Sequence, residues 1–161
     1  MSFSDYPTNI HKGGHYMEDP TIRLYEKTTD AIEEVVGRFG ATGTLDHQVS
    51  LWYTGAQVAG VFLKQRKHLP MISGKPSSNH AEDGESVDFA ASGIALVLLR
   101  LKSSQVIVKG NALSPEDATG KAVLRTTGPV GAIAAESVTT TQSDGWILAW
   151  LKTPSAADLD T

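Results

Sequence analysis

The sequence predicts an all-β protein, a sandwich or barrel-like single domain with an extended N-terminal arm. Three observations lead to this prediction. Short apolar runs recur along the chain, glycine-containing turns separate them, and the first part of the chain has no sustained periodicity of either kind. A length of 161 residues makes one domain the default and supplies enough apolar residues for one ordinary core.

The N-terminal segment 1–29 is expected to be an extended arm. Prolines and paired glycines interrupt it, and its scattered aromatic residues indicate that it lies against another surface. Residues 30–153 form the predicted β domain. The short polar segment 154–161 is expected to be a flexible tail.

Seven apolar segments of the β domain are predicted to contain its strands. These segments are 49–53, 58–63, 86–101, 106–108, 121–125, 130–135 and 146–151. Thr-Gly and Asp-Gly turns separate several of them, and Gly93 is expected to bend the longest one. Many short strands with glycine-containing turns are typical of a sandwich or a barrel.

The segment from Asp30 to Gly40 supports two interpretations. Four apolar residues between Ile32 and Phe39 follow the spacing of a helix face, with Asp30 as an N-cap and Gly40 as a stop. An internal comparison favours a strand instead, and we adopt the strand as the prediction.

That comparison identifies a diverged internal repeat. Segment 35–63 aligns with segment 106–136, so that strands and turns follow in the same order. The matched positions are Leu51 with Leu124, Thr54-Gly55 with Thr127-Gly128, and Val58–Val61 with Val130–Ile133. The alignment places Val35–Phe39 on Val106–Gly110 and therefore on a strand.

No catalytic motif is complete. Gly120-Lys121 would need a glycine five positions before Gly120 to form a phosphate-binding loop, and Pro115 stands there; Ala122 replaces the hydroxyl residue after the lysine. Asp88 replaces the second glycine of a nucleophile elbow around Ser86. We therefore predict that the chain is not an enzyme and has no cofactor.

Composition excludes further classes of protein. The chain has no cysteine, so no disulfide is predicted. His11 and His15 stand four apart, but the intervening Lys-Gly-Gly does not allow the helix that would bring them together, so no metal site is predicted. A net charge of −4 with both signs interspersed argues against a nucleic-acid partner. No apolar run approaches the ~20 residues of a membrane span, and the N-terminus lacks the apolar part of a secretory signal. We expect a soluble protein.

The closing segment 146–151 is apolar on both faces of a strand. Trp146, Leu148 and Trp150 lie on one face, and the three intervening residues lie on the other. The strand is therefore either central within one domain or packed on a neighbouring subunit through one face. Trp52, Trp146 and Trp150 are accordingly candidates for core or subunit-interface residues.

The order of these segments resembles the small capsid cement (decoration) proteins of tailed bacteriophages. The similar stretches are Gly37–Phe39, Val58–Gln65, Gly84–Val97, Val108–Leu113, Gly128–Ser137 and Gly145–Leu151, preceded by a short "MSF…YP" arm. Two features depart from the family pattern. Phe89–Ala91 replaces an arginine-containing turn, and residues 68–84 form an insert rich in turn residues.

The resemblance implies a non-enzymatic β protein that binds the outside of an expanded capsid. Such proteins are commonly homotrimers that bridge neighbouring major capsid subunits. The expected partners are thus the major capsid protein and other copies of the chain. The expected location is the outer surface of the virion, after synthesis in the bacterial cytoplasm. The arm residues expected to contact the capsid are Tyr6, His11, Tyr16 and Tyr25.

Two rival functions remain open from the sequence. The first is a β-sandwich module that binds carbohydrate or a host surface, which would require an exposed aromatic platform that includes Trp52 or Trp146. The second is a small hydrolase, which would require His80, Asp83 and Ser86 to converge in one pocket.

Overall fold

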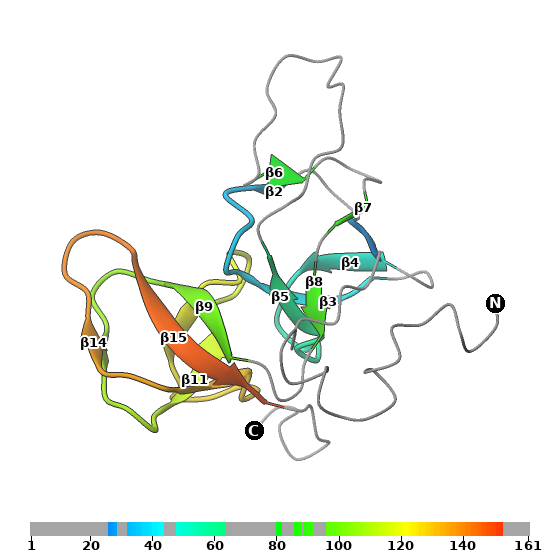
Figure 1. Ribbon diagram of the computed structural model, residues 1–161. Coiled ribbons are helices and arrows are strands. Elements are labelled where there is room, and N and C mark those ends of the chain that lie inside the picture. Colours follow the sequence, from blue (N-terminus) through cyan, green and yellow to red (C-terminus); the bar gives the residue numbers. More distant parts are fainter. Residues whose placement is uncertain are drawn as a thin grey trace, which may run out of the picture.

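Every regular element in the described part of the chain is a β-strand (Figure 1). The computed structural model describes residues 26–28, 32–43, 48–63, 80–81, 86–87, 89–91 and 96–152. The strands are β1 (Glu26–Thr28), β2 (Ile32–Glu33), β3 (Phe39–Thr42), β4 (Gln48–Leu51), β5 (Gly60–Phe62), β6 (His80–Ala81), β7 (Ser86–Val87), β8 (Phe89–Ala91), β9 (Leu96–Leu101), β10 (Val106–Ile107), β11 (Ala112–Pro115), β12 (Ala122–Leu124), β13 (Ala132–Ala134), β14 (Val138–Thr139) and β15 (Gly145–Leu151). Because no helix occurs in the described ranges, the all-β prediction is confirmed.

The first half of the chain forms a curved six-stranded sheet, here called the first unit. Its strand order is β7-β1-β4-β3-β5-β8, with β1 and β4 parallel and the other neighbours antiparallel. The edge strands β7 and β8 are separated along the chain by one residue. Since two residues span about 7 Å at most, the two edges of the sheet lie close together.

The second half forms a closed barrel, here called the second unit. Its strand order is β11-β12-β9-β15-β13. The long strand β15 pairs with β9 on one side and with β13 on the other, and β13 pairs with β11 to close the barrel. Two small sheets, β10-β14 and β2-β6, complete the fold.

The two units have the same strand topology. β3 lies between β4 and β5 as β11 lies between β12 and β13, and β1 runs parallel to β4 as β9 runs parallel to β12. β7 and β8 together take the place of β15. The register also agrees, because Gly40 pairs with Leu51 and Gly60 as Leu113 pairs with Leu124 and Ala132.

Hydrogen bonds outside the strands repeat in the same way. Gly37 donates its N–H to the Phe62 carbonyl at 2.8 Å, and Gly110 donates to the Ala134 carbonyl at 2.8 Å. Both glycines have a positive φ, 79° and 90°. The equivalent bonds from Ala59 N to Gly40 O and from Gly131 N to Leu113 O are both 2.9 Å. The chain is thus a structural duplication, which supports the repeat seen in the sequence.

The described residues 32–40 of the contested segment contain no helix. β2 occupies Ile32–Glu33, and the strand predicted to start at Val35 begins only at Phe39. Residues Val35–Arg38 form a turn in which Arg38 donates its N–H to the Val35 carbonyl at 3.2 Å. The left-handed conformation of Gly37 breaks an extended path at this point. The strand pairing therefore starts at Phe39, and the repeat aligns Phe39 with Ala112 rather than with Gly110.

One strand lies outside the segments predicted to contain strands. Ala112–Pro115 forms β11, which lies between β12 and β13. Serine and proline hide the alternation that usually identifies a strand, and tertiary pairing on both sides overrides this local signal. β1 also lies within the segment 1–29 expected to be the arm, so the folded part begins earlier than expected. Gly93 and most of the insert 68–84 lie outside the described residues.

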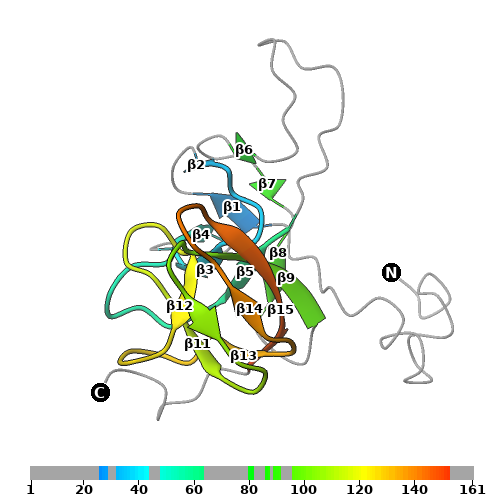
Figure 2. The ribbon, with the colours of Figure 1, turned by 90° about the vertical axis from the view of Figure 1, so that its left-hand side faces the viewer.

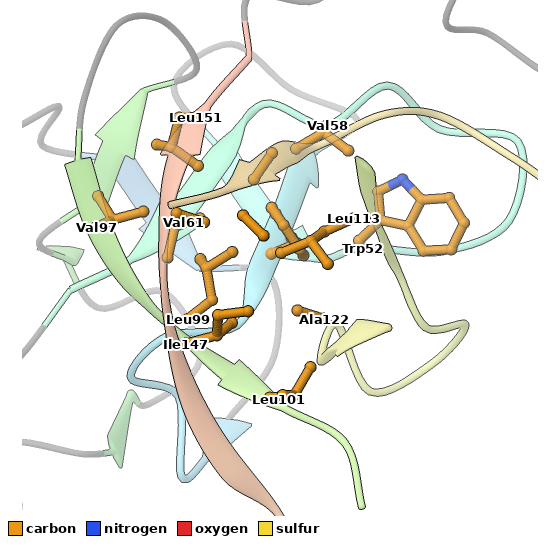
Figure 3. Close-up of a cluster of buried hydrophobic side chains, with 14 of the residues drawn as sticks. Trp52, Val58, Val61, Val97, Leu99, Leu101, Leu113, Ala122, Ile147 and Leu151 are labelled. Atoms are coloured by element: carbon orange, nitrogen blue, oxygen red, sulfur yellow. The ribbon is translucent and has the colours of Figure 1, made fainter. Parts of the chain in front are cut away.

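Two clusters of buried side chains hold the units together. The cluster inside the first unit consists of Val35, Val49, Phe62, Val87 and Phe89. The second cluster joins the interior of the second unit to the outer surface of the first, whose contribution is Phe39, Ala41, Trp52, Val58, Val61 and Ala90. Figure 3 shows Val61 among Leu99 and Leu151 of the barrel strands. The two units therefore share a core rather than only a surface contact.

Candidate interaction surface

The outer face of β9 and β15 carries five large apolar side chains, here called the apolar face. Leu96, Leu98, Trp146 and Trp150 are exposed, and Leu148 is partly exposed. They lie on one face because antiparallel pairing sets Leu96 opposite Trp150 and Leu98 opposite Leu148. Figure 2 brings both strands to the front of the molecule.

Exposure on this face is large for such side chains. Leu98 is 52% exposed, Trp150 48%, Trp146 39% and Leu96 38%. The alternate residues of the same strands, such as Leu99 and Ile147, are fully buried in the barrel. The prediction of two apolar faces on the closing strand is thus correct, and the tryptophan face is the open one. Contiguous exposed apolar residues of this kind mark an interaction surface.

The duplication indicates that this strand arrangement does not require a tryptophan at position 146. Ser86 pairs with Lys27 in the first unit as Trp146 pairs with Arg100 in the second. A polar residue therefore occupies the tryptophan position in a unit of the same topology. Strand pairing alone therefore does not account for the exposed indole of Trp146.

One edge of the apolar face is fixed by a charged side chain. The Arg100 guanidinium lies over the Trp146 ring, 5.3 Å from its centroid, in a cation–π contact. On the other side, a Cβ built on Gly37 would lie 2.6 Å from Trp146 Cζ3, so the first unit packs directly against this indole. Trp146 is therefore held in place before any partner binds.

The remaining predicted residues have separate locations. Trp52 is 5% exposed and belongs to the shared core, where its Nε1 donates to the Ala56 carbonyl at 2.9 Å. It is thus a core residue and not part of the exposed surface. The four arm residues predicted to contact the capsid, Tyr6, His11, Tyr16 and Tyr25, lie outside the described residues.

An ion pair and a hydrogen bond connect the two units beside the apolar face. Glu34 of the first unit lies 3.4 Å from the Arg100 guanidinium of the second, and Arg38 donates to the Thr119 carbonyl at 3.3 Å. Within the second unit, Asp144 accepts from Lys121 at 2.7 Å and from the Ser103 N–H at 3.1 Å. Burial lowers the pKa of Arg38, although its guanidinium stays charged in the neutral range.

Asp144 is expected to make stability depend on acid pH. The hydrogen bond from Lys121 lowers the pKa of Asp144, and Ser103 and Arg100 add to this effect. A depressed folded-state pKa stabilises the protein above the unfolded value of ~3.9, and this contribution is lost as pH falls further. Asp144→Asn should cost about 1–3 kcal/mol in the free energy of unfolding at pH 7. The difference from the parent should shrink below about pH 4.

Urea denaturation from pH 7 down to pH 3 measures this effect. Lys121→Met is the matched variant, because it removes the main cause of the pKa shift while leaving the carboxylate in place. It should weaken the acid dependence. An unchanged pH profile in Asp144→Asn would show that this carboxylate does not carry the effect.

The described residues contain no group of three histidine, cysteine, aspartate or glutamate side chains able to hold a metal ion. No helix in those ranges is long and apolar enough to cross a membrane. Of the hypothetical hydrolase residues, His80 lies in β6 and Ser86 in β7, and Asp83 lies outside the described part.

Comparison with known proteins finds no matching family model and no matching curated protein.

Proposed function

We propose that the chain is a structural, non-enzymatic protein that binds the outer surface of a tailed-bacteriophage capsid. It stabilises the shell by bridging neighbouring major capsid subunits, and it is synthesised in the host cytoplasm before joining the virion. The observation that carries the proposal is the apolar face, because exposed tryptophan and leucine side chains on one sheet face suit a protein partner. The resemblance in segment order to phage capsid cement proteins indicates that this partner is the major capsid protein.

Capsid binding in this proposal combines two kinds of contact. The rigid sheet face supplies preorganised side chains, since Trp146 is already fixed by Arg100 and by the packing at Gly37. The N-terminal arm adds contacts through Tyr6, His11, Tyr16 and Tyr25. A homotrimer then binds a symmetric shell through several weak contacts at once, which raises the overall affinity without strong individual contacts.

Cosedimentation with expanded, emptied capsid shells of the phage that encodes the chain tests this function. The parent should bind and protect the shells against thermal disruption. Deleting residues 1–20 should abolish binding while leaving β1 in the folded part, because β1 begins at Glu26. Leu98→Ser should weaken binding, whereas Val106→Ser on β10 should not, although Val106 is 65% exposed. Failure of the parent to bind shells would overturn the proposal.

A second candidate function is a carbohydrate-binding module. Trp146 and Trp150 are both exposed on the same face of β15, and such indole platforms stack against sugar rings. A glycan array with the purified chain tests this candidate. Binding that is lost in Trp146→Ala and unaffected by removal of residues 1–20 would favour it over shell binding.

A further inference from the structure

The duplication gives each outer surface of the first unit a counterpart on the second. On the first unit, paired residues of β3, β5 and β8 form a row consisting of Phe39, Val61 and Ala90. On the second unit, the paired residues of β11, β13 and β15 form the equivalent row of Ala112, Ile133 and Trp150. We call these the first row and the second row.

The first row is completely covered. Phe39, Val61 and Ala90 have no exposed surface and belong to the cluster shared with the second unit. A Cβ built on Gly131 would lie 2.7 Å from the Phe39 ring, and the Phe39 N–H donates to the Gly120 carbonyl at 2.7 Å. The second unit is therefore what covers the first row.

The second row is open. Trp150 is 48% exposed, and Ile133 and Ala112 are partly exposed. All three residues are apolar, as in the first row, but the large aromatic side chain stands at the β15 end instead of the β3 end. The first row is thus buried between the two units, whereas the equivalent second row is uncovered.

We propose that the first unit of a second copy of this chain covers the second row. The contact repeats between copies the packing that joins the two units within one copy. The two surfaces of such a contact differ, so the association is head-to-tail and closes into a ring where the rotation permits. This inference rests on the self-association in the proposed function and names its contact surface, so that Trp150 of the apolar face is assigned to the neighbouring copy and the rest of that face to the capsid. The contact itself requires only the chain.

The intrachain contact specifies which residues should meet between copies. Within one copy, Gly37 lies against Trp146, and the Gly37 carbonyl accepts from the Arg100 N–H at 2.8 Å. The repeat equivalents are Gly110 for Gly37 and Ser86 for Trp146. The Gly110 turn of one copy is therefore expected beside Ser86 of the next.

Sedimentation velocity of the purified chain over a range of concentrations tests the association without any shell. The parent should form a discrete oligomer. Ile133→Asp should weaken its association by about tenfold or more, because it places a charge in the centre of the contact. The matched control Val106→Asp, on exposed β10, should leave association unchanged. A parent that stays monomeric at all concentrations overturns the proposal.

Cysteine cross-linking distinguishes head-to-tail from face-to-face association, because the chain has no cysteine of its own. Lys109→Cys, next to Gly110, and Ser86→Cys are made separately. With a short bis-maleimide, each variant alone should give no dimer, and their mixture should. Dimers of Lys109→Cys alone would show a face-to-face contact and contradict the proposal. Shell binding by a monomeric chain would contradict this inference and the homotrimer, and it would leave the proposed binding to capsid shells intact.

Discussion

Replacing Phe39 with alanine is expected to destabilise the protein by about 3–5 kcal/mol. The Phe39 side chain is fully buried between the two units, and its ring lies against Gly131, where no side chain could fill the space left behind. Such a loss is a large part of the 5–15 kcal/mol by which most proteins of this size are stable. Urea denaturation followed by tryptophan fluorescence measures the change.

The same experiment shows whether the two units unfold together. Because the shared core joins the interior of the barrel to the surface of the first unit, a single transition at lower urea is expected. Leu98→Ala is the control, since Leu98 is half-exposed and its truncation should change stability by less than about 1 kcal/mol. Two separate transitions in Phe39→Ala, with the second unchanged, would show that the units are independent.

The sequence predicts the fold class because the strand signals are local. The closing strand has clear alternation, and its buried face of Ile147, Ala149 and Leu151 agrees with the prediction. The repeat was also detectable, since both copies keep Thr-Gly turns, at Gly55 and Gly128, with φ values of 88° and 81°. Glycine is retained at such positions because other residues are strained there.

Other parts of the fold depend on contacts that a local pattern does not contain. β11 carries Ser114 and Pro115, both buried, and it exists because strands pair with it on either side. The closure of the second unit likewise depends on β15 pairing with two strands distant in sequence. The sequence shows two apolar faces on that strand, but only the structure shows which of them is covered.

The two units fill the interior of the same strand arrangement with different side chains. Gly40 of the first unit faces the rings of Phe62 and Phe89, which meet edge to face with centroids 5.1 Å apart. In the second unit, Leu113 takes the place of Gly40, and Ala149 takes that of Phe89. A large residue on one strand is thus balanced by a small one on the other, as close packing demands.

This balance predicts a strong coupling between positions 40 and 89. Gly40→Leu alone should cost about 3 kcal/mol, because even a Cβ at this position would lie 2.7 Å from Phe89 Cε2. Phe89→Ala alone should cost about 3–5 kcal/mol through the cavity it leaves. The double variant restores the leucine–alanine pair of the second unit. It should therefore cost about 2 kcal/mol less than the sum of the two single changes.

A double-mutant cycle of urea unfolding free energies measures the coupling. The control cycle combines Gly40→Leu with Leu113→Ala, the equivalent position in the other unit, and the two effects should add within about 0.5 kcal/mol. The atoms that a Cβ at Gly40 would meet belong to side chains rather than to the backbone, and removing the Phe89 ring relieves the shortest of these contacts, while Phe62 Cε2 stays at 3.0 Å. Additive costs at positions 40 and 89 would show that the leucine–alanine pair of the second unit cannot replace the Gly40–Phe89 pair in the first unit.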